Sequence, residues 1–154
     1  MRLTIVAVGK PRDRHLAAAI DDYETRAARY WPLDVVEVKE ASARGVPPEQ
    51  AREREGARLL ERLPAGATLV VCDERGDRLT SQEFAALIAS FRDRATDLAF
   101  AIGGAFGLPP EVRARAARLL QLAPWTLPHE LARLVLAEQL YRAGTIARGE
   151  PYHN

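Results

Sequence analysis

The sequence is poor in the residues that build cross-links, metal centres and membrane spans. Its single cysteine, Cys72, excludes an internal disulfide framework, and its three scattered histidines offer no metal-ligand spacing. No apolar run approaches the roughly 20 residues that cross a bilayer, and the short apolar run near the N-terminus is more typical of a strand than of a secretion signal. We therefore expect a cytoplasmic protein that binds neither a metal nor a membrane.

An excess of charge of one sign is also lacking. The formal net charge is +1, from 22 basic and 21 acidic residues, which argues against a strongly electrostatic nucleic-acid binder. Residues 113–154 carry six basic and three acidic residues, and chance explains this modest bias as well as function does. Lysine occurs only twice, a scarcity that says nothing about activity.

The length and composition fit one folded domain. A chain of 154 residues, 47% hydrophobic and 28% charged, is long enough to bury a real core. No internal repeat, low-complexity tract or linker divides it. We expect a single domain over residues 1–154.

Apolar runs alternate with helical patterns along the whole chain. Near-continuous apolar runs are typical of strands buried on both faces, and the alternation predicts an α/β fold with a mainly parallel sheet flanked by helices. The polar segment 73–78 is predicted to be a turn. Strands are expected at 3–8, 33–38, 68–72, 98–102 and 119–122, and helices at 12–30, 47–63, 81–91, 109–116 and 128–147.

The last of these helices is apolar around most of its circumference. A surface helix normally buries one stripe, so this one needs a second cover besides the sheet. Self-association is preferred here over internal burial. The apolar positions include Leu131, Leu134, Val135, Leu136, Leu140, Tyr141 and Ile146.

Two loops after predicted strands are candidates for ligand binding. The glycine loop 102–107 (IGGAFG) allows close backbone approach, but it follows the fourth strand and matches neither the dinucleotide fingerprint nor the Gly-Lys-Ser/Thr phosphate loop. The loop 122–127 (LAPWTL) is stiffened by proline and suits a flat apolar group such as adenine. A plain tight turn and a core-packing connection remain open alternatives for the two loops.

Three further positions are chemically versatile. His153 carries an imidazole, a side-chain type that can take up or release a proton, Tyr152 can stack on a base, and His129 either caps the last helix or lines a pocket. Solvent-exposed residues without a role are the alternative for the tail. Cys72 ends a buried-type strand, as a small core residue does.

Five ordered segments together carry a more specific signal. The chain resembles the small SPOUT-class (α/β-knot) methyltransferases of the RNA methyltransferase H family, which modify N3 of a pseudouridine in 23S rRNA. The resemblance covers nearly the whole length. The matching segments are LTIVAVGK, LVVCDERG, IGGAFG, TLPHELARLVLAEQLYRA and PYH.

The resemblance implies a C-terminal trefoil knot, a homodimer, and a 23S rRNA substrate presented by the ribosome. It also implies that His153 assists proton loss from N3, Tyr152 positions the base, and Arg142 stabilises charge on a carbonyl oxygen. The implied cofactor is S-adenosylmethionine, and the residues implied to bind it are Cys72, Gly103, Gly104, Leu122, Ala123, Pro124, Trp125, Thr126 and Leu127.

Three alternatives differ in chemistry. One is another SPOUT methyltransferase, acting on a ribose 2′-hydroxyl or on tRNA. The second is a nucleotide-binding α/β protein without methyl transfer, and the third is a ribosome-associated factor that binds no cofactor.

Overall fold

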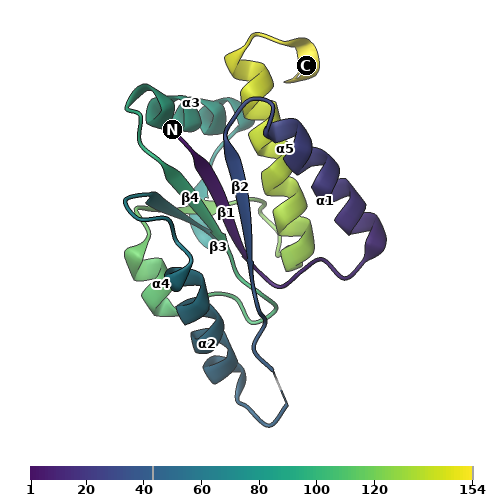
Figure 1. Ribbon diagram of the computed structural model, residues 1–154, viewed down its shortest axis with the longest axis vertical. Coiled ribbons are helices and arrows are strands. Elements are labelled where there is room, and N and C mark those ends of the chain that lie inside the picture. Colours follow the sequence, from purple (N-terminus) through teal and green to yellow (C-terminus); the bar gives the residue numbers. More distant parts are fainter. Residues whose placement is uncertain (43, 154) are drawn as a thin grey trace.

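The fold is one five-stranded parallel sheet with helices on both faces, as seen in a computed structural model (Figure 1). The structure describes residues 1–42 and 44–153, with the side chain of His153 excepted. The strand order is β2-β1-β4-β3-β5, and every neighbouring pair is parallel. The strands are β1 (Leu3–Val8), β2 (Leu33–Val38), β3 (Thr68–Arg78), β4 (Leu98–Ile102) and β5 (Arg118–Gln121).

The helices form two layers. Helices α1, α3 and α5 cover one face, and α2 and α4 cover the other (Figure 1). Side chains alternate between the faces along β1, so Ile5 packs with the first layer and Val6 with the second. The helices are α1 (Arg14–Ala27), α2 (Pro48–Glu61), α3 (Ser81–Asp93), α4 (Pro110–Arg115) and α5 (His129–Ala147), followed by the 3-10 turn η1 (Pro151–His153). The predicted parallel sheet is confirmed.

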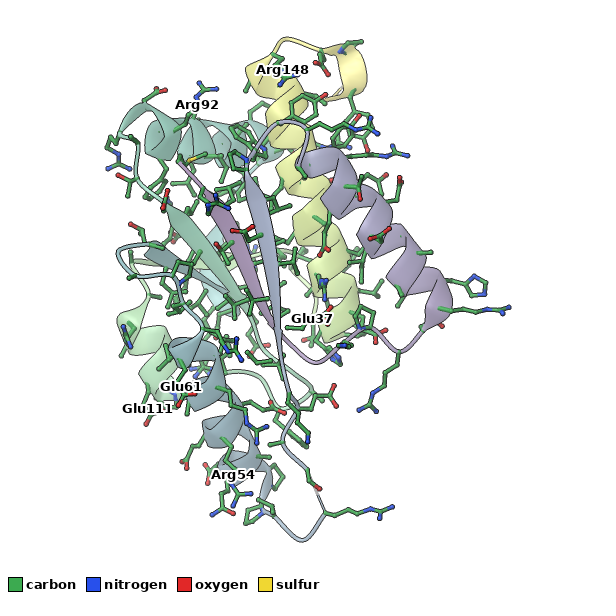
Figure 2. The ribbon with its side chains drawn as sticks, in the orientation of Figure 1. Glu37, Arg54, Glu61, Arg92, Glu111 and Arg148 are labelled. Carbon is green, nitrogen blue, oxygen red and sulfur yellow. The ribbon has the colours of Figure 1, made fainter. Side chains whose placement is uncertain are left out.

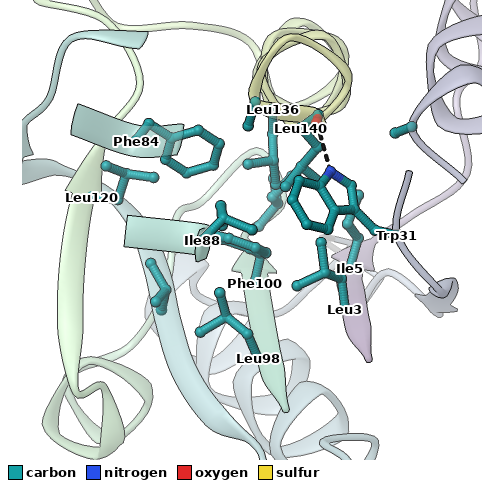
Figure 3. Close-up of a cluster of buried hydrophobic side chains, with 14 of the residues drawn as sticks. Leu3, Ile5, Trp31, Phe84, Ile88, Leu98, Phe100, Leu120, Leu136 and Leu140 are labelled. Atoms are coloured by element: carbon teal, nitrogen blue, oxygen red, sulfur yellow. Dashed lines mark hydrogen bonds between the residues drawn. The ribbon is translucent and has the colours of Figure 1, made fainter. Parts of the chain in front are cut away.

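The larger core cluster joins α1 and α5 to the sheet (Figure 3). Trp31 packs there with Leu3 and Leu140, and its indole N–H donates to the Leu140 carbonyl oxygen at 2.8 Å. That bond satisfies the one polar atom of a side chain that is 3% exposed. It also ties the segment between α1 and β2 to α5.

Helix α5 has more internal partners than its sequence suggests. It packs on α1 along one side and on α3 along the other (Figure 1), so neighbours within the chain cover much of its apolar surface. Leu131, Leu134 and Val135 remain half-buried. Self-association through α5 stays a prediction. Among the described residues, no helix combines the length and apolar character of a membrane span.

The prediction of a turn at residues 73–78 is wrong, because β3 continues through this segment to Arg78. Cys72 and Asp77 both pair with Leu120 of β5, so the residues between them bulge out of the ladder. Gly76 permits the close crossing, since a Cβ there would lie 2.5 Å from the Leu120 backbone nitrogen. Pairing with a distant strand therefore overrides the local turn signal.

Candidate functional site

Two cavities open at the carboxyl edge of the sheet, where all five parallel strands end. The smaller has a volume of about 390 Å³ and the larger about 910 Å³. Both are lined by Ala105 and Phe106, which lie at the tip of the loop after β4. Open α/β sheets bind their ligands at this edge, and both volumes suit a small organic ligand.

The smaller cavity is enclosed by three segments that are distant in sequence. They are the bulge of β3 at 73–75, the loop 105–108 after β4, and the segment 121–127 after β5. Of the six residues predicted in the last segment, five line the cavity: Leu122, Ala123, Trp125, Thr126 and Leu127. Pro124 is exposed and lies outside the lining.

Cys72, Gly103 and Gly104 are not among the residues that line this cavity. Burial raises the pKa of the Cys72 thiol to about 12, so it is an inert core group. The loop folds back on itself through a hydrogen bond from the Gly107 N–H to the Gly104 carbonyl oxygen at 3.0 Å. Gly107, with φ of +74°, is the glycine that this turn requires. Asp73 and Ala105, their neighbours, face the cavity instead.

Asp73 is a buried carboxylate of the smaller cavity, fixed by two hydrogen bonds. Its side chain is 6% exposed and accepts from the Arg113 Nε at 2.5 Å and from the Arg75 N–H at 2.9 Å. Burial works to raise the pKa of Asp73, but the hydrogen bonds from Arg75 and Arg113 outweigh it and leave that pKa lowered. Asp73 is therefore a fixed carboxylate at neutral pH.

Sequence reasoning missed Asp73 and its partner because the segment was taken for an ordinary turn. A usable signal was present: three charged residues, 73–75, follow directly after a buried strand. Charged side chains at the carboxyl end of a parallel strand reach the ligand-binding edge.

Two of the three residues predicted to be catalytic, Arg142 and Tyr152, lie together, but away from the cavities. Tyr152 donates to the Glu138 Oε1 at 3.2 Å, and the Arg142 guanidinium bonds the same oxygen at 2.7 Å. Arg142 also lies over the Tyr152 ring, 4.8 Å from its centroid. Burial first, then the contacts with Tyr23 and Glu138, raise the pKa of Tyr152. The side chain of His153 lies outside the described part of the structure.

This cluster is far from both cavities within one chain. Helix α5 begins with His129, which lines the larger cavity, and Arg142 follows 13 residues later. At 1.5 Å per residue the two are about 20 Å apart along the helix axis. Ala132, which lines the smaller cavity, is about 15 Å from Arg142 by the same rise. Figure 2 marks the two ends, with Glu37 of the larger cavity beside the start of α5 and Arg148 at its finish.

Comparison with known proteins identifies the family to which the chain belongs. The sequence model of the family described as "Predicted SPOUT methyltransferase" matches residues 1–153. A protein of Gemmatimonas aurantiaca named "Ribosomal RNA large subunit methyltransferase H" is 58% identical over 99% of both chains. Proteins of the same name from Anaeromyxobacter dehalogenans and Geobacter metallireducens are 50% and 46% identical, each covering at least 99% of both chains.

Solved structures agree with the fold. One described as "Structural insights into the 2-OH methylation of C/U34 on tRNA" aligns with a TM-score of 0.51 and 25% identity, over 94% of this chain and 97% of that one. A second, described as "Crystal structure of an hypothetical protein", aligns with a TM-score of 0.54 and 16% identity, over 96% and 89%. The family inferred from the five sequence segments is confirmed: the chain belongs to the SPOUT methyltransferases.

Proposed function

We propose that this protein transfers a methyl group from S-adenosylmethionine to N3 of a pseudouridine in 23S rRNA, in the cytoplasm and on the assembled ribosome. The observation that carries the proposal is the cavity of about 390 Å³ where segments 73–75, 105–108 and 121–127 converge. It occurs in a chain whose relatives named "Ribosomal RNA large subunit methyltransferase H" are 43–58% identical over full length. We further propose a single domain over residues 1–154, with the trefoil knot that the resemblance implies.

The chemical groups of this cavity fit the proposed methyl donor. The backbone of residues 122–127 offers N–H and C=O groups to the edge of an adenine ring, as does the backbone of 105–108. Asp73 and Glu74 are acceptors for hydroxyl and ammonium groups. Arg52 also lines the cavity, and its buried Nε has no hydrogen-bond partner among the described residues, which suits a carboxylate.

The proposed donor, when bound, supplies an electrophilic methyl group on a sulfonium. The protein then has to align the pseudouridine N3 with that carbon and remove the N3 proton. We assign proton removal to His153, positioning of the base to Tyr152, and stabilisation of charge on a carbonyl oxygen to Arg142. We also keep Cys72, Gly103 and Gly104 as proposed donor-binding residues, each through backbone groups next to the lining residues Asp73 and Ala105.

A homodimer follows from this assignment. Arg142 lies about 15 Å along α5 from Ala132, which lines the smaller cavity of its own chain, by the helix rise of 1.5 Å per residue. A second copy would therefore bring Arg142 and Tyr152 to the donor. The half-buried apolar residues Leu131, Leu134 and Val135 on α5 are available for such a contact. The dimer is the form in which both halves of the proposed site meet.

The proposal is tested by calorimetric titration and nucleoside analysis. S-adenosylmethionine is expected to bind, and ATP and FMN are not. Mass analysis of treated ribosomes should place one methyl group on a 23S rRNA pseudouridine, and His153→Ala should lower turnover without changing donor affinity. His15→Ala is the matched control, because His15 is exposed on α1. A methylated ribose or tRNA would refute the proposed substrate.

A further inference from the structure

The larger cavity is not used by the function proposed above. It lies at the carboxyl ends of β1 and β2, between the start of α5 and the middle of α2. Its volume is about 910 Å³, within the range of sites for small organic ligands. Because Ala105 and Phe106 line both cavities, a ligand here would lie directly beside one in the smaller cavity.

Two buried polar atoms at this cavity have no hydrogen-bond partner among the described residues. They are the Oε2 of Glu55 and the Nε2 of His129. Glu55 is 2% exposed, and His129 Nε2 is 4.0 Å from the Glu40 Oε1, too far for a hydrogen bond. Unpaired buried polar atoms are rare in folded proteins and cost about 1–3 kcal/mol each. Their presence on one cavity points to a polar ligand.

The fold holds Glu55 in this position. Its Oε1 accepts from the Ala41 N–H at 3.1 Å, which fixes the carboxylate against the end of β2. On the other side the chain passes close at Gly104, where an added Cβ would lie 3.0 Å from the Glu55 Oε2. Ala51 and Leu59, four residues before and after Glu55, are fully buried, so the carboxylate interrupts the apolar stripe of α2. An aliphatic residue would serve packing better there.

Burial of this carboxylate carries an electrostatic cost. Burial raises the pKa of Glu55, and the negative charge of Glu40 adds to the rise, while the Ala41 N–H, Arg58 and His129 work against it. Destabilised charges of this kind cluster at functional sites.

Two lysines lie at the mouth of the same cavity, which Arg12, Glu37 and Glu40 also line. Lys10 and Lys39 are the only lysines of the chain, and both line it. Both are exposed, and neither forms a salt bridge with any residue that the structure describes. Free ammonium groups beside a cavity for a polar ring suit the phosphates of a nucleotide.

We propose that the larger cavity binds the acceptor nucleotide and that Glu55 accepts the N1–H of its pseudouridine base, the group that uridine lacks. This inference rests on the proposed function. In pseudouridine the ribose is bonded to C5, so N1 carries a hydrogen, whereas N1 of uridine is bonded to ribose. N3 has to face the methyl donor beyond Ala105 and Phe106, so N1–H is the donor left for recognition.

The chemistry of the two unpaired groups matches that base edge. A carboxylate accepts hydrogen bonds and so suits an N–H, while a neutral imidazole N–H donates to a ring carbonyl. A substrate that lacks the matching N–H leaves the buried acceptor without a hydrogen bond, and sites built this way reject such substrates strongly. Glu55 is therefore a specificity-determining residue, and Lys10 and Lys39 hold the backbone.

The test compares two ribosome preparations, one with pseudouridine at the acceptor position and one with uridine there. The measured quantity is the ratio of their kcat/KM values. Glu55→Gln keeps the shape of the side chain but replaces the carboxylate, and it is expected to lower this ratio about 10- to 100-fold. Glu53→Gln, on the exposed face of the same helix, is the control and should leave the ratio unchanged.

The outcomes separate this inference from the proposed function. An unchanged ratio in Glu55→Gln, with donor affinity also unchanged by calorimetry, would overturn the role of Glu55. Failure of the wild-type protein to methylate either preparation would overturn the proposed function, and this inference with it. If Glu55→Gln does not fold, Glu55→Asp withdraws the carboxylate by one methylene, and its ratio should fall as well.

Discussion

The ion pair between Asp73 and Arg113 makes a quantitative prediction about the smaller cavity. The Arg113 side chain is 22% exposed and that of Asp73 is 6% exposed, and their 2.5 Å contact lies in a region from which water is largely excluded. Arg113→Met keeps most of the apolar stem and removes the charge. Asp73 then retains the Arg75 N–H but loses its guanidinium partner.

The expected loss of stability follows from the hydrogen bond that the Asp73 carboxylate loses. A hydrogen bond to a charged group contributes about 1.5–3 kcal/mol, so the free energy of unfolding at pH 7 should fall by about that amount. Urea denaturation followed by circular dichroism measures it. A double-mutant cycle with Asp73→Asn should show a coupling energy of about 1 kcal/mol or more, since the two side chains are in direct contact.

The same pair has a definite pH dependence. The pKa of Asp73 is lowered from its ordinary value of 3.8 in the folded state. Its ionised form therefore stabilises the fold above that pH, and the stabilisation is lost as the pH falls through the lowered pKa. Removing Arg113 removes much of this stabilisation, so the stability difference between wild type and variant should shrink below about pH 4.

Arg115→Met is the matched control, since Arg115 is exposed on the same short helix. That variant should change the unfolding free energy by no more than about 0.5 kcal/mol. A loss below 0.5 kcal/mol in Arg113→Met at pH 7, or a loss that stays constant into acid, would refute the account of Asp73.

Two further predictions concern the packing of α5 and the larger cavity. Gly144→Ala should lower the free energy of unfolding by about 1–3 kcal/mol, measured by urea denaturation, because the added Cβ would lie 2.3 Å from the Tyr30 Cγ. This overlap should outweigh the better helix propensity of alanine. A raised melting temperature would contradict this packing. Lys10→Ala combined with Lys39→Ala should weaken ribosome binding and reduce the slope of log affinity against log salt by about one per lysine. An unchanged slope would show that these lysines contact no phosphate.

Much of the fold was predictable because its signals are local. Predicted strands of four to six residues alternate with helical periodicity, and this alternation suffices for a parallel sheet between helix layers. The family was also accessible, since five short segments in order are specific even when each alone is weak. The exception was the second half of β3, where the DERGDR segment reads as a turn but pairs with β5.

The lining of the smaller cavity was predictable only to within a residue or two. Cys72 was expected beside the cofactor, but the cavity begins at Asp73, because β3 bulges there instead of ending. Gly103 and Gly104 were expected to face the ligand, but the loop closes on itself and presents Ala105 and Phe106. Glu55 passed unnoticed, although an acid between two apolar residues at four-residue spacing was a readable signal.

Local sequence was enough to set where strands and helices begin, because backbone preference and hydrophobic period act within one turn or one strand. Which side chains meet was decided by the strand order β2-β1-β4-β3-β5, since that order brings Lys10, Lys39, Glu55 and His129 to one cavity. It also carries Arg142 and Tyr152 to the opposite end of α5. Contacts between residues so far apart in the chain depend on the packing of the whole sheet and its helices, and no short stretch of sequence contains that information.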